Sequence, residues 1–277
     1  MTLAADPGVR SGWSWDHDVA SPARIRDAAL RGHDNYATDR AALRELDEAA
    51  PGFTDLLRAA RAWHVRVVRH LAARGLDQFL DLAAGLPTAQ DNTHQTAQRQ
   101  NPDAKVIYTD TDRLVLSYER ALLDENDNTA VVHADHLEPG HLLGHETVCT
   151  AFDLARPVAV LMTTGVQHEP DDARLAAAVA GYRALLPPGS VLALSCWSLP
   201  ESVGTGPAAR TIERTWESRC RRAVRCRTET GVERLFAGFD LLDPGLVRLQ
   251  DWWPDGPALR VPRPAQRLAV GGVGIKR

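Results

Sequence analysis

Apolar residues recur with helical spacing in the N-terminal part of the chain. One such set comprises Leu56, Ala60, Trp63, Val67 and Leu71, at steps of three or four residues. This spacing places them on one side of a long α-helix, which Gly75 is expected to end. Ser21 followed by Pro22 predicts the start of an earlier helix, because serine favours the position before a helix and proline the first helical position. Residues 21–76 are therefore predicted to be helical.

Beyond this segment the pattern changes to short apolar runs separated by amphipathic stretches. The runs are residues 78–82, 105–109, 129–133, 157–162 and 190–196, and the stretches lie near residues 90–100, 112–123, 138–145 and 171–186. Strands that alternate with helices favour parallel crossovers and an open, doubly wound sheet. The predicted fold class is α/β.

The alternation breaks between residues 200 and 238, where an arginine-rich helix is expected. Its apolar stripe comprises Ile212, Trp216, Cys220 and Ala223. Two late strands are expected around residues 240–250 and 267–275. We interpret residues 21–277 as a single domain with an N-terminal helical lid (21–76) and an inserted helical cap (200–238). Residues 1–20 show no periodicity, which predicts a flexible arm.

Composition and charge limit the class of partner. None of the apolar runs approaches the length needed to cross a bilayer, and the N-terminus carries charged residues where a secretion signal would be apolar. A cytoplasmic protein is expected. The net charge of −4 provides no field for gathering nucleic acid, and the four cysteines have no metal-binding spacing. We expect a small-molecule substrate, no nucleic acid, membrane or metal, and leave a homodimer open.

Candidate chemistry lies in the loops after the strands, because ligands of open parallel sheets bind beyond the carboxyl ends of the strands. The first loop follows Asp81 and contains Ala83 and Gly85, small residues that let a ligand approach the backbone. Asp110 ends the second strand and can accept hydrogen bonds from two ribose hydroxyls. Asp135 follows the third strand, where it can meet the exocyclic amine of adenine. Each acid alone is equally typical of a helix cap, but together on successive strands they predict a nucleoside site.

The turn also indicates which nucleoside. A dinucleotide requires G-x-G-x-x-G, whereas residues 83–88 read AAGLPT and lack two of the three glycines. A nucleoside without phosphates needs only one glycine and the acids. S-adenosylmethionine is a ligand of that kind.

Several blocks resemble those of a known family. They are residues 32–39 (GHDNYATD), 79–88 (FLDLAAGLPT), 92–94 (NTH), 106–116 (VIYTDTDRLVL) and 167–171 (QHEPD). From about Ser21 to the end, the chain resembles the actinobacterial S-adenosylmethionine-dependent methyltransferases once catalogued as a domain of unknown function. The resemblance implies a Rossmann-like class I methyltransferase sheet of seven strands, one of them antiparallel.

Three positions depart from the family pattern. Ala83 replaces the first glycine of the turn, His33 replaces a lysine and Ala60 replaces an asparagine. A positive φ at Ala83 would cost about 1–2 kcal/mol, which corresponds to about tenfold weaker cofactor binding.

Roles follow from the loops and from the matched blocks. His168 is the first candidate for a general base, because imidazole can accept a proton near neutral pH; the alternative is a hydrogen bond to its own loop. His33 is the second candidate, and Tyr36 is a candidate to cover the reactive methyl group. The expected cofactor-binding residues are Asp34, Asn35, Asp81, Ala83, Gly85, Asn92, His94, Asp110, Thr111, Asp112, Asp135, Thr163 and Thr164.

The leading functional hypothesis is a methyltransferase of specialised metabolism that acts on a small molecule. Two alternatives also involve S-adenosylmethionine: a protein that binds it but no longer transfers methyl groups, and an enzyme that catalyses its intramolecular cyclisation. A nucleotide-dependent oxidoreductase is a third. For the acceptor, the arginines of the predicted cap favour an anionic substrate if two of them turn inward, and Trp197, Trp252 and Trp253 are candidates to line an apolar pocket.

Overall fold

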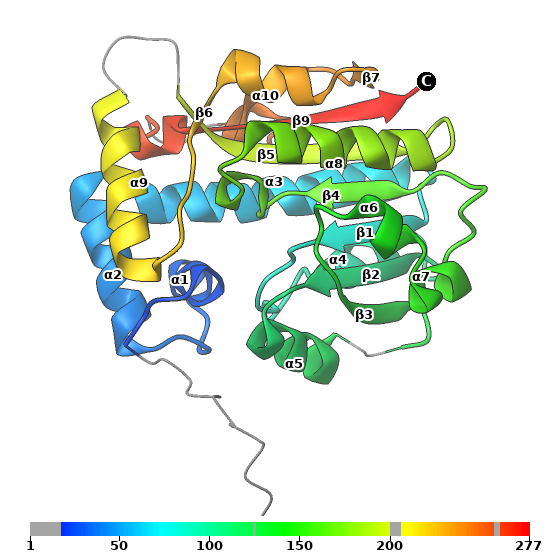
Figure 1. Ribbon diagram of the computed structural model, residues 1–277, viewed down its shortest axis with the longest axis horizontal. Helices are drawn as coiled ribbons and strands as arrows, with labels where there is room; N and C mark the ends of the chain where they lie inside the picture. Colours follow the sequence, from blue (N-terminus) through cyan, green and yellow to red (C-terminus); the bar gives the residue numbers. More distant parts are fainter. Residues whose placement is uncertain (1–17, 124–125, 200–205, 258–260) are drawn as a thin grey trace, which may run out of the picture.

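The architecture is a central β-sheet with helices on both faces (Figure 1). The computed structural model describes residues 18–123, 126–199, 206–257 and 261–277. Most of the predicted arm and residues 200–205 of the predicted cap lie outside the described residues. The α/β fold class predicted from the sequence is confirmed.

The sheet follows the order β3-β2-β1-β4-β5-β9-β7. The strands are β1 (Gln78–Leu82), β2 (Lys105–Asp110), β3 (Thr129–His133), β4 (Ala159–Met162), β5 (Val191–Leu199), β6 (Arg227–Thr228), β7 (Phe239–Leu241), β8 (Val247–Arg248) and β9 (Ala269–Lys276). The first five pair in parallel, and β9 runs antiparallel to β5, β7 and β8. Where seven strands were expected, the described part of the sheet has nine, because the two-residue strands β6 and β8 pair beside the main path of seven. The predicted strand over 240–250 is divided between β7 and β8.

The helices are α1 (Pro22–Ala29), α2 (Ala37–Ala49), α3 (Phe53–Ala73), α4 (Thr93–Gln98), α5 (Arg113–Leu122), α6 (Pro139–Leu143), α7 (Glu146–Ala151), α8 (Asp172–Leu185), α9 (Gly206–Cys220) and α10 (Glu229–Leu235). Three short 3₁₀ turns, η1 (Val166–His168), η2 (Leu249–Asp251) and η3 (Pro264–Arg267), complete the set. Helix α1 begins at Pro22, as predicted. Gly75, just after α3, adopts a φ of 93°, which is the left-handed conformation expected where a helix stops.

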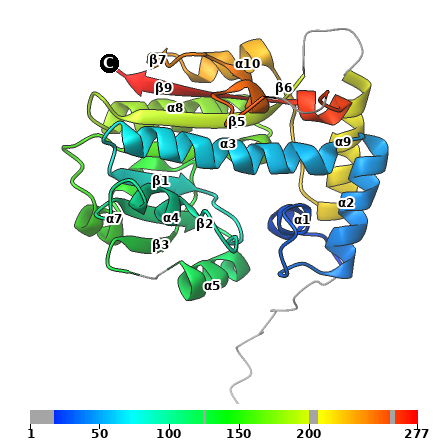
Figure 2. The same cartoon turned by 180° about the vertical axis from the view of Figure 1, so that it is seen from behind.

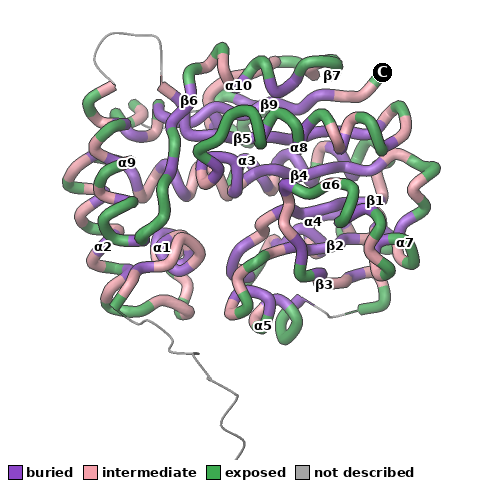
Figure 3. The backbone as a smooth tube through the Cα atoms, in the orientation of Figure 1, coloured by how far each residue is buried: buried purple, intermediate pink, exposed green. Residues whose placement is uncertain are grey.

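Consecutive strand residues bury their side chains on opposite faces of the sheet. Phe79 belongs to the apolar cluster beneath α3, which includes Trp63 and Val67, whereas Leu80 belongs to the cluster beneath α8. Figure 1 shows the face covered by α8, Figure 2 shows the face covered by α3, and the strands between them are buried (Figure 3). A sheet covered on both faces requires apolar residues throughout its strands, which explains the continuous apolar runs.

Helices α1, α2 and α9 gather beyond the carboxyl ends of the parallel strands (Figures 1 and 2). The segment predicted as a helical lid (residues 21–76) therefore lies in two places: α1 and α2 are at the edge of the sheet, whereas α3 runs along one of its faces (Figures 1 and 2). The N–H of Ala20 donates to the carbonyl of Arg219 at 3.1 Å, and Phe53 of α3 lies 6.2 Å from Trp216 of α9. N-terminal and inserted helices are therefore in direct contact. The stripe predicted for α9 is buried except for Ala223, which follows the end of the helix and is exposed.

Candidate functional site

A cavity opens at the carboxyl edge of the parallel strands, between the sheet and these helices. Its walls come from the loops after β1, β2 and β4, from β5, from α1 and from α9 with the segment that follows it. Of the residues predicted for the site, eight line the cavity: Ala83, Gly85, Asp110, Thr111, Asp112, Thr163, Thr164 and His168. Acidic groups gather at one end and aromatic rings at the other.

Asp110 dominates the acidic end. Its Oδ1 accepts hydrogen bonds from the backbone N–H groups of Thr111 and Asp112, each at 2.8 Å, and its Oδ2 accepts one from Gly85 at 3.3 Å. Asp112 caps α5 by accepting from the N–H of Leu114 at 2.9 Å. Burial raises the pKa of Asp110. Because Oδ2 holds a single long hydrogen bond, it keeps capacity to accept from a ligand hydroxyl.

The small-residue turn takes the left-handed conformation that its glycine permits. Gly85 has a φ of 75° and Ala83 a φ of 51°, so the positive φ considered for this alanine is present. The carbonyl of Ala83 accepts a hydrogen bond from Thr164 Oγ1 at 2.7 Å. A β-carbon on Gly165 would come within 3.1 Å of the Ala83 methyl carbon. That methyl group therefore points at the loop after β4, and Gly165 leaves room for it.

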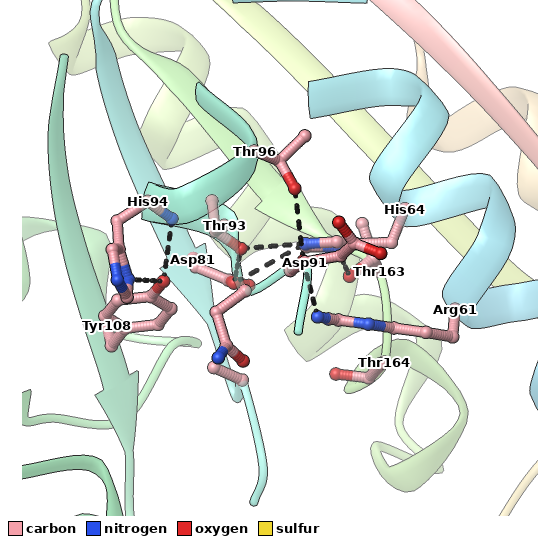
Figure 4. A network of polar contacts seen from close by, with 12 residues as sticks. Arg61, His64, Asp81, Asp91, Thr93, His94, Thr96, Tyr108, Thr163 and Thr164 are labelled. Carbon is pink, nitrogen blue, oxygen red and sulfur yellow. Dashed lines mark hydrogen bonds and ion pairs between the residues drawn. The ribbon is translucent and has the colours of Figure 1, made fainter. Parts of the chain in front are cut away.

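A network of buried polar side chains connects four elements behind the turn (Figure 4). Thr93 Oγ1 donates to Asp81 Oδ2 at 2.5 Å and lies 2.8 Å from Nε2 of His64, whose Nδ1 lies 2.9 Å from Thr163 Oγ1. Because the Thr93 hydroxyl donates its hydrogen to Asp81, its oxygen must accept one from Nε2 of His64. The neutral ring therefore carries its hydrogen on Nε2, and Nδ1 accepts a hydrogen bond from the Thr163 hydroxyl. Asp81 and His64 thereby tie β1, α3, α4 and the end of β4 together.

Burial favours the uncharged form of both ionisable groups in this network, Asp81 and His64. It raises the pKa of Asp81 to about 6, although the hydrogen bond from Thr93 and the charges of Arg61 and Arg26 act in the opposite direction. It also lowers the pKa of His64 well below its usual value, with Arg61 and Arg26 adding to the effect. His64 is therefore neutral at physiological pH.

Asn92 and His94 shape the floor of the site from outside the cavity. The side chain of Asn92 accepts a hydrogen bond from the Thr88 N–H at 3.0 Å and forms a capping box with Gln95 at the start of α4. His94 is buried, and its Nδ1 lies 2.8 Å from the hydroxyl of Tyr108. Asn92 thus caps α4, and His94 connects α4 to β2. The cofactor role of these two residues stays a prediction.

The block at residues 32–39 folds around Asp27. Its Oδ2 accepts hydrogen bonds from the N–H of Asp34 at 2.9 Å and from Asn35 Nδ2 at 2.7 Å. A β-carbon on Gly32 would overlap the Asp27 carboxylate, at 1.8 Å from Oδ1, which explains the glycine. Asp34 also faces the hydroxyl of Tyr118 on α5. The block therefore extends from α1 toward α5.

His33 and Tyr36, two of the predicted catalytic residues, are exposed and do not line the cavity. The guanidinium carbon of Arg24 lies 4.9 Å above the ring of Tyr36. Asp135 lies outside the cavity too, where its Oδ2 accepts a hydrogen bond from Arg174 Nη2 at 2.7 Å. The roles expected for these three residues stay predictions.

The aromatic end is formed by His168, Trp197 and Trp216. The ring centroids of the two tryptophans are 5.1 Å apart at 83°, and His168 lies 5.4 Å from Trp216 and 6.2 Å from Trp197. Nδ1 of His168 is buried and has no hydrogen-bond partner in the described structure. Burial, reinforced by the charge of Arg222, lowers the pKa of His168 to about 4. Its imidazole is neutral at pH 7.

Several cavity residues were not identified from the sequence as site residues, among them Arg26, His136 and Trp216. Arg222 is one of the cap arginines that the sequence made candidates for binding an anionic substrate, and it lines the cavity. Arg26 Nη1 donates to the carbonyl of Ala84 at 2.7 Å, and burial lowers its pKa to about 10. His136 directly follows Asp135 and carries a buried Nε2 without a partner among the described residues. Proximity to the predicted acid would have been a signal for His136. Trp216 stood out only as part of an apolar stripe, and Arg26 carries no motif.

Two findings concern the classes of partner. Over the residues that the structure describes, no helix is both long and apolar enough to cross a membrane. Within these residues, no group of three or more His, Cys, Asp and Glu side chains is arranged to hold a metal ion.

Comparison with known proteins places this cavity in context. Residues 10–277 match the family described as S-adenosyl methyltransferase. The structure is similar to a candidate methyltransferase from Thermobifida fusca YX (35% identity, TM-score 0.86, 96% of this chain and 100% of that one). It is also similar to a DUF574 family protein from Streptomyces avermitilis MA-4680 (32% identity, TM-score 0.87, 95% and 99%). The search of curated proteins gives no match.

Proposed function

Given that the chain belongs to the S-adenosyl methyltransferase family and has the class I methyltransferase fold, we propose that it methylates a small molecule held at the aromatic end of the cavity. The methyl donor is S-adenosylmethionine, as the family implies. This family membership argues against the nucleotide-dependent oxidoreductase that was an alternative from the sequence.

One observation supports placing the cofactor and the acceptor at opposite ends of the cavity. Asp110 and the turn at Ala83–Gly85 form one end, and the rings of His168, Trp197 and Trp216 form the other. The acidic end suits the adenosine of the cofactor, because Asp110 Oδ2 retains acceptor capacity for ribose hydroxyls. Gly85, with its positive φ, presents backbone without a side chain beside that carboxylate. The residues present thus fit the cofactor, and Asp110, Gly85, Thr163 and Thr164 are the groups proposed to hold it.

The reaction divides the work between cofactor and protein. When bound, S-adenosylmethionine supplies an electrophilic methyl group on a sulfonium, whose sulfur keeps the electron pair of the broken bond. The protein must exclude water and align the acceptor. Helices α1 and α9, which lie beyond the carboxyl ends of the parallel strands (Figure 1), contribute cavity residues and are placed to enclose the acceptor.

His168 is proposed to accept the proton of the acceptor hydroxyl. Nε2 of His168 faces the amide nitrogen of Gln167, a hydrogen-bond donor, at 3.4 Å. In the neutral ring Nε2 is therefore the nitrogen without a hydrogen that can accept a proton, and the buried Nδ1 carries the hydrogen. A pKa of about 4 makes His168 a weak base toward a free hydroxyl. As the hydroxyl oxygen becomes alkylated, however, its proton becomes far more acidic than imidazolium, and a neutral imidazole can then take it. His168 then releases the proton to solvent.

Product analysis tests this function. The purified protein is incubated with S-adenosylmethionine alone and then with a bacterial small-molecule extract, and both thioether products are measured. S-adenosylhomocysteine that forms only with the extract supports methyl transfer. Methylthioadenosine formed without an acceptor would contradict it and favour cyclisation, and binding of the cofactor without any product would favour a binding protein.

A further inference from the structure

The aromatic end of the cavity presents ring faces at several angles. Trp197 and Trp216 are nearly perpendicular, at 83°, whereas His168 is tilted by 35° from Trp216. Phe53 packs edge-on against Trp197, with centroids 5.3 Å apart, and holds that ring in place from the side of α3. Aromatic faces and edges bind other rings in stacked or perpendicular contact. A flat ring is therefore the shape that this surface favours.

A cation, Arg222, belongs to the same cavity wall as these rings. Arg222 lines the cavity just after α9, and no hydrogen bond or ion pair engages it in the described structure. The preceding residue, Arg221, has a φ of 50°, and this left-handed turn ends the helix. The charge of Arg222 adds to the burial that lowers the pKa of His168.

Neighbouring arginines of the inserted segment already have partners. Arg219 pairs with Glu45 of α2. Arg225 and Arg227 both pair with Asp172, at 3.0 and 2.8 Å. These ion pairs connect α9 and the segment after it to α2 and α8. The charge of Arg222 has no such partner in the described structure and can bind a ligand.

Within the described part of the chain, no acidic residue lines the aromatic end of the cavity to balance that charge. Among the described residues, the carboxylates that line the cavity are Asp110 and Asp112, which lie at the end of β2 and just after it, at the opposite end of the cavity. The wall near the rings is otherwise neutral, with Gln167, Ser195 and Leu249. An unpaired guanidinium at the mouth of an aromatic, otherwise neutral wall favours an anion of matching size.

From these observations we propose that the acceptor is a planar aromatic compound that carries a carboxylate. The ring lies against Trp197, Trp216 and His168, and the carboxylate binds Arg222. This assignment rests on the proposed function, because it fills the acceptor end of the same cavity.

Calorimetric titration with matched ligands tests the assignment. The probes are planar hydroxy acids of one to three fused rings, among them salicylate and 3-hydroxy-2-naphthoate, each paired with its uncharged primary amide. Titrations use the full chain saturated with S-adenosylhomocysteine. We expect at least one acid to bind at least tenfold more tightly than its amide, with an affinity that falls as salt is added.

The variant Arg222→Gln removes the charge from an exposed side chain and should leave the fold intact. Acid affinity is expected to fall at least tenfold, while the affinities for the amide and for S-adenosylmethionine stay unchanged. Arg210→Gln, on the exposed face of α9 and outside the cavity, is the matched control and should bind the acid like the native protein.

The outcomes separate this inference from the proposed function. Equal binding of acids and amides, or an unchanged acid affinity in Arg222→Gln, would overturn the assignment of the acceptor while S-adenosylmethionine still binds. Binding of aromatic phosphates but not of carboxylates would overturn it as well. Failure of S-adenosylmethionine itself to bind the native protein would instead defeat the proposed function.

Discussion

Glu119 is fully buried on α5, and neither carboxylate oxygen has a hydrogen-bond partner in the described structure. Burial, together with the nearby Asp110 and Asp81, raises its pKa to about 9. The folded state therefore holds a proton on Glu119 that the unfolded chain loses near pH 4.5. Stability must fall as the pH rises from about 4.5 toward 9, because folding at those pH values requires proton uptake.

Glu119→Gln should remove this dependence. The amide has the size of the protonated acid but never ionises. Between pH 4.5 and pH 8 we therefore expect the variant to lose about 4 kcal/mol less unfolding free energy than the native protein. Urea unfolding between pH 4.5 and 9 measures the difference. Glu233→Gln, at an exposed position of α10, should parallel the native protein, and parallel curves for Glu119→Gln would refute a neutral buried acid.

Ala83 holds a conformation that glycine adopts without strain, with a φ of 51°. Ala83→Gly should raise the free energy of unfolding by about 0.5–1 kcal/mol, because relief of the left-handed strain exceeds the added flexibility of the unfolded chain. Thermal denaturation checks the sign. Ala84→Gly, the next residue, has no positive φ to relieve and should destabilise; a loss of stability in both variants would mean that the Ala83 methyl contributes more by packing than it costs.

His168→Ala should lower turnover while leaving the affinity for S-adenosylmethionine intact. The residue lies at the aromatic end, away from Asp110, and its Nε2, which accepts only a long hydrogen bond from Gln167, is the ring nitrogen proposed to take the proton. Because its pKa is about 4, the rate should show no loss from imidazole protonation between pH 5.5 and 8. Turnover and cofactor affinity that fall together would remove it from the proton-accepting role.

At the scale of elements, a buried ion pair ties α1 to α2. Arg24 Nε donates to Asp39 Oδ2 at 2.8 Å, and the same carboxylate accepts from the N–H groups of Ser21 and Tyr36. Asp39 is fully buried. Removal of the guanidinium would leave a buried charge that only backbone dipoles balance.

Arg24→Met should therefore destabilise the protein by about 3 kcal/mol in urea unfolding. Arg44→Met, exposed on α2, should change stability by less than about 0.5 kcal/mol. Equal effects of the two variants would show that the pair contributes no more than a surface charge.

Elements with strong local signals could be predicted from the sequence. The run at residues 78–82 becomes β1 with those bounds, and the apolar face of α3 is buried as its spacing requires. The strand expected over 240–250 divides into β7 and β8, which pair with different parts of β9. Pairing along β9 is a tertiary property that periodicity does not encode.

The same distinction holds for the site. Asp110, Gly85 and Thr164 follow strand ends, whose position in a parallel sheet is fixed by topology, and they line the cavity. Arg26 and Trp216 come from helices, and their orientation depends on how α1 and α9 pack over the sheet edge. Loop residues of the site could therefore be predicted, whereas its helical wall could not.

At the scale of the whole molecule, one cavity joins two chemically different ends. Asp110 and the turn after β1 form the acidic end, and the rings and Arg222 form the aromatic end. The N-terminal helices and α9 close over both, since Ala20 bonds to Arg219 and Phe53 contacts Trp216. Cofactor and acceptor are thus expected to meet beneath a shared helical cover.

Isothermal titration calorimetry with S-adenosylmethionine on Asp110→Asn tests this arrangement most directly. Loss of a charged acceptor should weaken binding by about 2 kcal/mol, or about thirtyfold, while Asp103→Asn, an exposed position before β2, binds like the native protein. Native affinity in a folded Asp110→Asn variant would contradict the placement of the adenosine at the end of β2.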